Sequence, residues 1–167
     1  MKPNLPMRKI LSIIIFISIL SARSPYTYVY LLPFENIQND PAVEWIAGGL
    51  TDMVHQELKN HLGLRMKTKE DLEIIMNDRS LMMNQPRGSR NVLILGKFNR
   101  QLDKVHVSIQ MVDVATWEEL GVRKIMEVYT QIPSLNKAVG TTVNQMITPY
   151  IPSQPVAKVS PDRKSVV

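Results

Sequence analysis

The stretch from Tyr26 to Leu62 constrains the fold of this chain more than any other part of the sequence. An apolar, β-rich run over 27–34 ends near Pro33, a polar loop follows, and a long helical pattern begins at Asp40-Pro41. The run is apolar at nearly every position, which is typical of a strand buried on both faces. Apolar residues of the helical pattern form one stripe, made by Ile46, Leu50, Met53, Val54, Leu58 and Leu62. We therefore expect a buried strand followed by a helix packed on its sheet.

The helical pattern also carries signals for its start, its middle and its end. Asp40-Pro41 supplies an N-cap and a first helical residue, so a helix is predicted over about 41–61. Gly48-Gly49 lies inside it, where each glycine costs about 1 kcal/mol relative to alanine. The pair lacks the spacing of a phosphate-binding loop, so it predicts close packing against a backbone or a local break. Gly63 is the predicted helix stop.

The rest of the sequence alternates between short strands and amphipathic helices. Thr68 suits the N-cap of a helix over 69–81, because acidic residues follow in its first turn. The other predicted elements are strands at 64–67, 91–100, 104–113 and 119–129 and a helix at 133–150. The last three strands are joined by short turns and form an antiparallel meander. The order β-α-β-α-β-β-β-α predicts an α/β (α+β) fold, in which helices pack on a mixed sheet of about five strands.

Residues 1–24 are predicted to be a targeting segment that lies outside the domain. Arg8 and Lys9 precede the apolar run from Ile10 to Ala22, and small residues follow. This is the layout of a secretory signal peptide, and the run is shorter than the roughly 20 residues of a spanning helix. Cleavage after Ala22 is expected, with an uncleaved N-terminal anchor as the alternative. Both place the domain, residues 25–151, outside the cytoplasm, in the periplasm or associated with the envelope.

The composition bounds the partners and the compartment. Of 20 basic and 15 acidic residues, several basic ones lie in the N-terminal segment and in 152–167, which we expect to be a flexible tail. The domain itself is close to neutral and has no basic stripe, so no nucleic-acid partner is predicted. The chain has no cysteine. It therefore has no disulfide, no thiolate metal site and no cysteine that could be lipid-modified.

Three segments together resemble a known superfamily of bacterial envelope domains. Leu32-Pro33-Phe34 and the helix WIAGGLTDM at 45–53 look like the opening of TolB N-terminal-like domains. Residues 64–82 and 91–120 are similar to the strand–helix and strand–hairpin segments of the curli-secretion protein CsgG and its relatives. The envelope proteins FlgO and LpoB are similar in the same way. The resemblance covers about residues 27–150 and rests on the order and spacing of these segments.

The resemblance implies an α/β domain that binds proteins or assembles into rings and has no catalytic activity. The chain departs from the pattern in three respects. It has no cysteine to acylate, and it has no spare segments for the membrane-inserted strand pairs of CsgG, each strand of which needs about 9–11 residues. Trp117 stands where the turn of the family usually carries glycine.

No set of residues in the sequence converges on catalysis or metal binding. His55 shares a helix face with Asp52 but points away from His61, which fits a solvated helix face. We therefore predict no catalytic residue, no metal and no cofactor. His106, Ser108, Gln110, Arg123 and Glu127 are predicted to share one polar sheet face, which either is solvated or meets a partner. Candidate partner contacts are Trp45, Met82, Met83, His106, Trp117 and Arg123.

The sequence therefore predicts a non-enzymatic, exported envelope domain that binds proteins or self-assembles. Its setting would be a secretion, flagellar or cell-wall system, where it would be an accessory component. The alternative is a periplasmic domain that binds a small ligand or senses one. Contact with a membrane is expected only through an uncleaved N-terminal segment.

Overall fold

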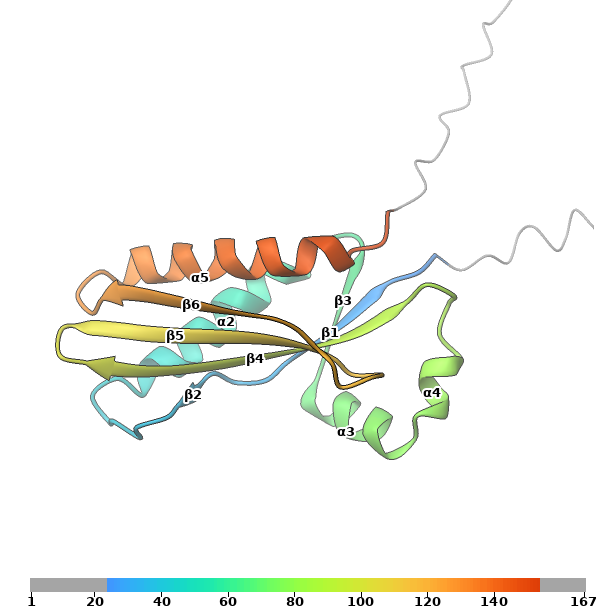
Figure 1. Cartoon of the computed structure of the whole chain (residues 1–167), viewed down its shortest axis with the longest axis horizontal. Helices are drawn as coiled ribbons and strands as arrows, with labels where there is room; N and C mark the ends of the chain where they lie inside the picture. Colours follow the sequence, from blue (N-terminus) through green and yellow to red (C-terminus); the bar gives the residue numbers. More distant parts are fainter. Residues whose placement is uncertain (1–23, 154–167) are drawn as a thin grey trace, which may run out of the picture.

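Six strands form one mixed sheet in residues 24–153, the part of the chain that the structure, a computed structural model, describes (Figure 1). The predicted signal segment and most of the predicted tail lie outside these residues. The strands are β1 (Thr27–Leu31), β2 (Glu35–Asn36), β3 (Leu64–Lys67), β4 (Arg90–Gln101), β5 (Lys104–Asp113) and β6 (Glu119–Val128).

The first strand lies inside the sheet, as its continuous apolar pattern predicts. The strand order is β3-β1-β4-β5-β6, and β1 is parallel to both β3 and β4. The short β2 pairs with β4 beyond the end of β1. Strands β4, β5 and β6 form the predicted antiparallel meander, in which β6 is an edge strand. The α/β class and the mixed sheet are therefore confirmed.

Helices cover the two faces of the sheet unequally. The long helices α2 (Trp45–Lys59) and α5 (Ile132–Ile147) pack on one face, and the short helix η1 (Thr148–Tyr150) follows α5. On the other face, α3 (Lys69–Asn77) and α4 (Ser80–Met83) lie near the end where β1 and β4 begin (Figure 1). Among the described residues, no helix lies over the end of this second face that is nearer the β4–β5 turn (Figure 1).

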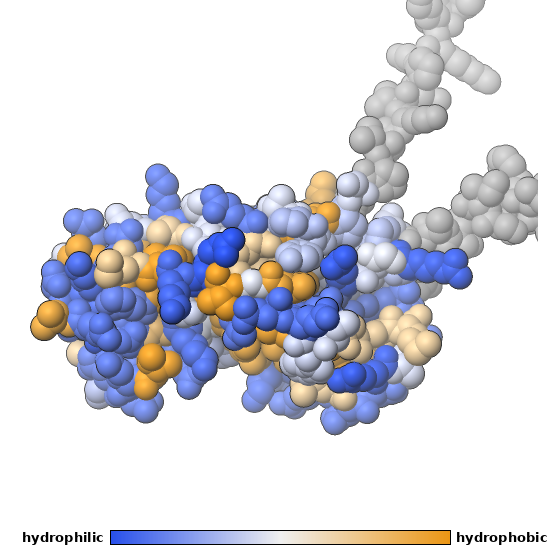
Figure 2. Space-filling model, viewed as in Figure 1, coloured by the Kyte–Doolittle hydropathy of each residue, from blue (hydrophilic) through white to orange (hydrophobic). Residues whose placement is uncertain are grey.

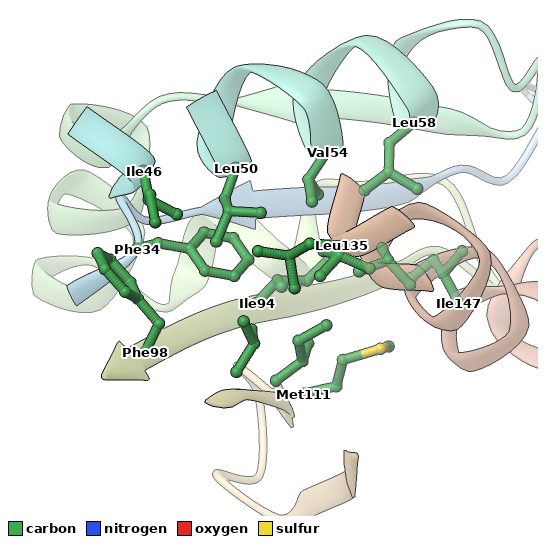
Figure 3. Close-up of a cluster of buried hydrophobic side chains, with 14 of the residues drawn as sticks. Phe34, Ile46, Leu50, Val54, Leu58, Ile94, Phe98, Met111, Leu135 and Ile147 are labelled. Atoms are coloured by element: carbon green, nitrogen blue, oxygen red, sulfur yellow. The ribbon is translucent and has the colours of Figure 1, made fainter. Parts of the chain in front are cut away.

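The main core lies between α2, α5 and the sheet. The predicted stripe of α2 is buried at four positions, and these side chains point toward Phe34, Ile94 and Leu135 (Figure 3). The predicted apolar face of β5 is also buried here, through Val105, Val107, Ile109 and Met111. A smaller core lies under α3 and is made by Tyr30, Leu72, Ile75, Leu93, Val112 and Val114.

The predicted limits of the first helix are wrong at both ends. Residues 41–44 form turns and α2 begins at Trp45, because the Asp40 carboxylate accepts the N–H of Ala42 at 2.9 Å as an Asx turn. The helix ends at Lys59, before Gly63. Gly63 serves close packing instead, since a Cβ there would lie 2.6 Å from Ile151 Cγ2.

The interpretation of the glycine pair in α2 is also wrong. The helix runs without a break through Gly48 and Gly49, and both residues are exposed. A Cβ built at either position would have no atom within 4 Å beyond its own helix and chain neighbours. The pair therefore supports neither close packing nor a kink within the described residues.

The second helix has the predicted cap but is shorter than predicted. Thr68 and Asp71 form a reciprocal capping box at the start of α3. The helix ends at Asn77, because Asp78 has an extended backbone and its carboxylate accepts the N–H of Ser80 at 3.0 Å. The apolar pattern up to Leu81 therefore belongs to two helices, α3 and α4.

Candidate functional site

The register of the β5–β6 hairpin decides which side chains share the open face of the sheet. Opposite residues of an antiparallel pair point to the same face. Val112 pairs with Glu119 but Met111 pairs with Gly121, so Leu120 is an extra residue, a β-bulge. The bulge shifts the pairing of all later residues of β6 by one position, so Ser108 lies opposite Lys124 and not opposite Arg123.

The bulge overturns the predicted grouping of the polar sheet face. Arg123 pairs with Ile109 and Glu127 pairs with Val105, so both side chains belong to the helix-covered face. His106, Ser108 and Gln110 do share the opposite face, as predicted. A one-residue shift in register moves every following side chain to the other face, which is the reason for this error.

A groove of about 540 Å³ occupies the part of this face that no helix covers. Its floor consists of rows across three strands: Lys97, Ser108 and Lys124 in one row, and Asn99, His106 and Met126 in the next. Ile37, which follows β2, forms one wall and is 51% exposed. Met126 is 53% exposed. The groove therefore combines exposed apolar side chains with basic ones.

The electrostatics of the groove are basic. Lys97 and Lys124 flank Ser108, and His106 lies in the adjacent row. Within residues 24–153, the only acid that forms an ion pair with these cations is Glu35, whose carboxylate lies 3.7 Å from Lys97 Nζ. Both members of this pair are more than half exposed, so it is worth no more than about 1 kcal/mol. Lys124 has no ion pair within residues 24–153.

The polar side chains of the groove are not joined to one another in the part of the chain that the structure describes. Within residues 24–153, no hydrogen bond links Ser108 to His106, and no carboxylate orients the His106 ring. No cluster of three or more His, Asp or Glu side chains in that same range is placed to hold a metal ion. What remains is a surface of apolar contacts, lysine ammonium groups and amide groups.

The predicted contact residues do not gather at one site. His106 lies in the groove. Trp45 is 57% exposed at the start of α2, where its indole N–H donates to the Ala42 carbonyl at 3.2 Å. Arg123 is exposed on β6 and points away from the groove.

The other predicted contacts lie at the opposite end of the sheet. Met82 is half-buried against the smaller core, whereas Met83 is 86% exposed. Both line a hollow of about 240 Å³ with Asp113 and Ala115. The following turn carries Trp117, which is 43% exposed and has a φ of 61°.

Most groove residues were not predicted from the sequence, among them Ile37, Lys97, Lys124 and Met126. Ile37 stands alone in a polar loop, and this isolated apolar residue was the one local signal available. Met126 and Lys124 could be placed only through the bulged register. On the side of the molecule seen in Figure 2, hydrophobic residues form separate patches between hydrophilic ones.

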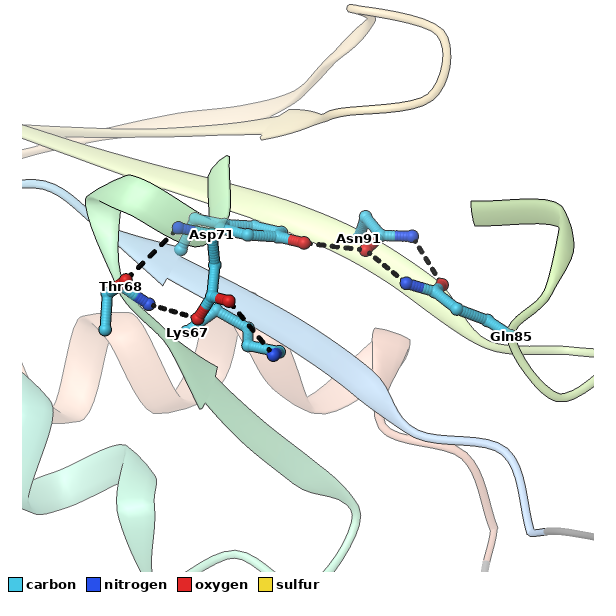
Figure 4. Close-up of polar contacts among 6 residues, drawn as sticks. Lys67, Thr68, Asp71, Gln85 and Asn91 are labelled. Carbon is cyan, nitrogen blue, oxygen red and sulfur yellow. Dashed lines mark hydrogen bonds and ion pairs between the residues drawn. The ribbon is translucent and has the colours of Figure 1, made fainter. Parts of the chain in front are cut away.

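A second polar cluster, near α3 and α4, is structural (Figure 4). Asn91 donates to Gln85 Oε1 at 2.8 Å and accepts from the Tyr30 hydroxyl at 3.2 Å. Burial, with the nearby carboxylate of Asp71, raises the pKa of Tyr30 to about 12. Hydrogen bonds from Thr68, together with Lys67, lower the pKa of Asp71. These contacts fasten the 84–90 segment and the start of α3 to the sheet.

These features define an α/β domain with one helix-covered sheet face and one partly open face. A similar arrangement occurs in the crystal structure of TolB from Acinetobacter baumannii, with a TM-score of 0.51 and 16% sequence identity. The overlay covers 77% of this chain and 30% of the TolB chain. The domain therefore has the fold of a part of TolB and spans about a third of that protein's length.

Two other solved structures overlay less well than TolB. A PelC dodecamer from Paraburkholderia phytofirmans gives a TM-score of 0.45 at 11% identity, covering 78% of this chain and 91% of PelC. Lipoprotein GNA1162 from Neisseria meningitidis gives 0.43 at 14% identity, covering 71% of this chain and 95% of that one. Overlays at these scores do not establish a shared fold.

No family model matches the chain, and no curated protein matches it in sequence. The TolB-like part of the sequence resemblance is thus supported at the level of fold, whereas the likeness to CsgG stays a prediction. Among the helices in residues 24–153, none has the length and apolar character needed to cross a bilayer.

Proposed function

We propose that this chain is a non-enzymatic, exported domain of the bacterial envelope that works by binding protein. Its role is that of an accessory component of a secretion, flagellar or cell-wall system. The signal-like pattern of residues 1–24 and the resemblance to TolB N-terminal-like and CsgG-like domains support the compartment. The TolB-like fold is in keeping with this.

One observation carries the binding role: within residues 24–153, no helix covers the part of the sheet face that holds the groove (Figure 1). The groove brings together Ile37 and Met126, each about half exposed, and apolar side chains that gather on a surface mark interaction sites. Lys97 and Lys124 stand beside these apolar residues. Apolar side chains that adjoin polar and charged ones are found at protein–protein interfaces.

Site-specific photo-crosslinking tests this role. A crosslinking amino acid placed at Ile37 or Met126 of the full chain should give adducts of discrete mass in envelope extracts. The matched control is Ile74, which is 55% exposed on α3, away from the groove. Equal labelling at all three positions, or adducts from Ile74 alone, would refute the groove as the binding surface.

The compartment is tested separately by fractionation of cells that express the full chain. We expect the protein in the periplasmic or membrane fraction, and mass spectrometry of its N-terminus should report cleavage near Ala22. Recovery of the intact chain in the cytoplasmic fraction would contradict the proposed export. This result is independent of the crosslinking experiment.

A small-ligand binding role is the second candidate, because the groove volume of about 540 Å³ falls within the range of ligand pockets. His106 lies on β5, the middle of the three strands that form the groove floor. A thermal-shift screen of the full chain against the His106→Ala variant tests it. A compound that stabilises the wild type and leaves the variant unchanged would favour this function over protein binding.

A further inference from the structure

The outer edge of β6 carries backbone groups that have no partner within residues 24–153. The N–H of Tyr129 donates to the Asp103 carbonyl at 2.6 Å, so odd-numbered residues from Arg123 onward direct their backbone toward β5. The even-numbered residues direct theirs away from the sheet. The side chain of Arg123 donates to the outward carbonyl of Val122 at 3.0 Å, which agrees with this assignment.

The free groups belong to the middle of the strand. The carbonyl of Val128 is used by the N–H of Gln131 at 2.9 Å. The N–H and C=O groups of Lys124 and Met126 have no hydrogen-bond partner within residues 24–153. A strand edge with such groups can accept a further strand.

Arg123 and Glu127 lie on the same strand and the same face, and neither forms an ion pair within residues 24–153. They flank Ile125, which is half-buried and packs against the main core. On its helix-covered side the strand therefore carries a cation, an apolar residue and an anion, in the order Arg123, Ile125 and Glu127. Such an order is self-complementary when two copies run antiparallel.

We propose that two copies of this chain pair through their β6 edges, antiparallel and with a two-fold axis at Ile125. This pairing rests on the proposed protein-binding function and names a second copy as one partner. The outward groups of Lys124 bond to those of Met126 in the second copy, and the reverse. Arg123 of each copy lies opposite Glu127 of the other, and the two Ile125 side chains face each other.

Charge selects this register among those that the backbone allows. A two-fold axis at Lys124 places two lysines opposite each other, and an axis at Arg123 places two arginines opposite each other. An axis at Met126 sets Ile125 against Glu127. Like charges directly opposite destabilise a strand pair. Of these four axes, only the one at Ile125 joins unlike charges and buries apolar area.

The same pairing affects the groove. Lys124 and Met126 belong both to the free edge and to the groove floor. In the paired arrangement the open faces of two copies adjoin along the two-fold axis. The binding surface of the dimer is then one continuous area that contains both grooves.

A charge-exchange experiment tests the register. Sedimentation velocity of the full chain should show a monomer–dimer equilibrium, and Arg123→Glu or Glu127→Arg alone should weaken dimerisation about tenfold or more. An equimolar mixture of the two variants should restore it, because each unlike pair then reforms in the heterodimer. The double variant R123E/E127R should dimerise like the wild type.

A cysteine placed on the two-fold axis gives a second test. The chain has no cysteine, and the central pair lies about 4.5 Å apart between Cα atoms, within the range for a disulfide. Ile125→Cys should oxidise to a covalent dimer, whereas Leu102→Cys, on the exposed β4–β5 turn, should not. This design does not depend on the stability of the charge variants.

Three outcomes would overturn the proposal: a wild-type chain that stays monomeric up to about 200 µM, a mixture that fails to rescue, or equal crosslinking at both cysteine positions. A monomer whose groove still crosslinks to other envelope proteins would remove the dimer and leave the proposed function standing. Loss of groove crosslinking with an intact dimer would do the opposite.

Discussion

Alanine in place of glycine should have opposite effects on stability at different positions of this chain. Gly48 and Gly49 lie on the exposed side of α2, where an added Cβ has no atom within 4 Å outside its own helix and chain neighbours. Gly96 lies on β4, where an added Cβ would be 2.3 Å from the Phe34 ring. Phe34 is 3% exposed, so its ring has no free space into which to move.

The magnitudes follow from these surroundings. Gly→Ala in an exposed helix interior stabilises by about 1 kcal/mol, so the double variant G48A/G49A should gain about 2 kcal/mol. At roughly 4 °C per kcal/mol, its Tm should rise by about 8 °C. Overpacking a buried site costs about 1–3 kcal/mol, so Gly96→Ala should lower the free energy of unfolding by that amount.

Urea denaturation of the full chain, followed by circular dichroism, measures both effects. Gly121→Ala is the matched strand control, because its added Cβ would meet Met146 Cε at an ordinary 4.0 Å. That variant should be near neutral. A lower free energy of unfolding in G48A/G49A would refute the reasoning, because it would mean that the side of α2 that carries the two glycines packs against other parts of the protein. A neutral Gly96→Ala would refute the placement of Phe34.

Three further predictions concern turns, caps and titration. Leu102 is 91% exposed with a φ of 57°, so Leu102→Asn should raise the free energy of unfolding by about 1 kcal/mol in urea titrations. Thr68→Ala should lower the free energy of unfolding by about 1 kcal/mol. The pKa of Asp71 is lowered in the fold, so the stability that its carboxylate contributes should be lost as the pH of an acid titration falls through this lowered pKa. The pKa of Tyr30 is raised to about 12, so the stability that its neutral phenol contributes should be fully present below a pH of about 10 and lost toward pH 12. Absorbance titration of the wild type and of Tyr30→Phe checks this shift. A Tyr30 phenol that titrates at the ordinary tyrosine pKa would contradict it.

The sheet was predictable from the sequence because its strands carry the period that their surroundings require. The run over 27–34 is apolar on both sides, and β1 has a parallel neighbour on each edge. Strand β5 alternates because one of its faces meets α2 and α5 while the other meets solvent. In both strands the order of apolar and polar residues follows directly from which faces of that strand are buried.

The groove was not predictable, because it depends on how two strands are aligned. Strand β6 carries apolar and charged residues on both faces, so its own pattern does not state which face is buried. The pairing counted from the turn would set Ser108 against Arg123, and the bulge at Leu120 replaces that partner with Lys124. The glycine pair misled for a related reason: sequence shows that glycines are present but does not show what lies across from them.

The bulge therefore links the fold, the groove and the proposed edge pairing. Inserting one residue after Gly121 would set Val122 opposite Ile109 and shift the pairing by one residue along the rest of the strand. Lys124 would then turn toward the main core, and Arg123 and Glu127 would turn into the groove. Burying a lysine among the side chains under α5 costs several kcal/mol, so we expect the insertion variant to unfold at a much lower urea concentration. An insertion variant with wild-type stability would mean that β6 tolerates both registers, and the groove and the charge order along its edge would then lose their structural basis together.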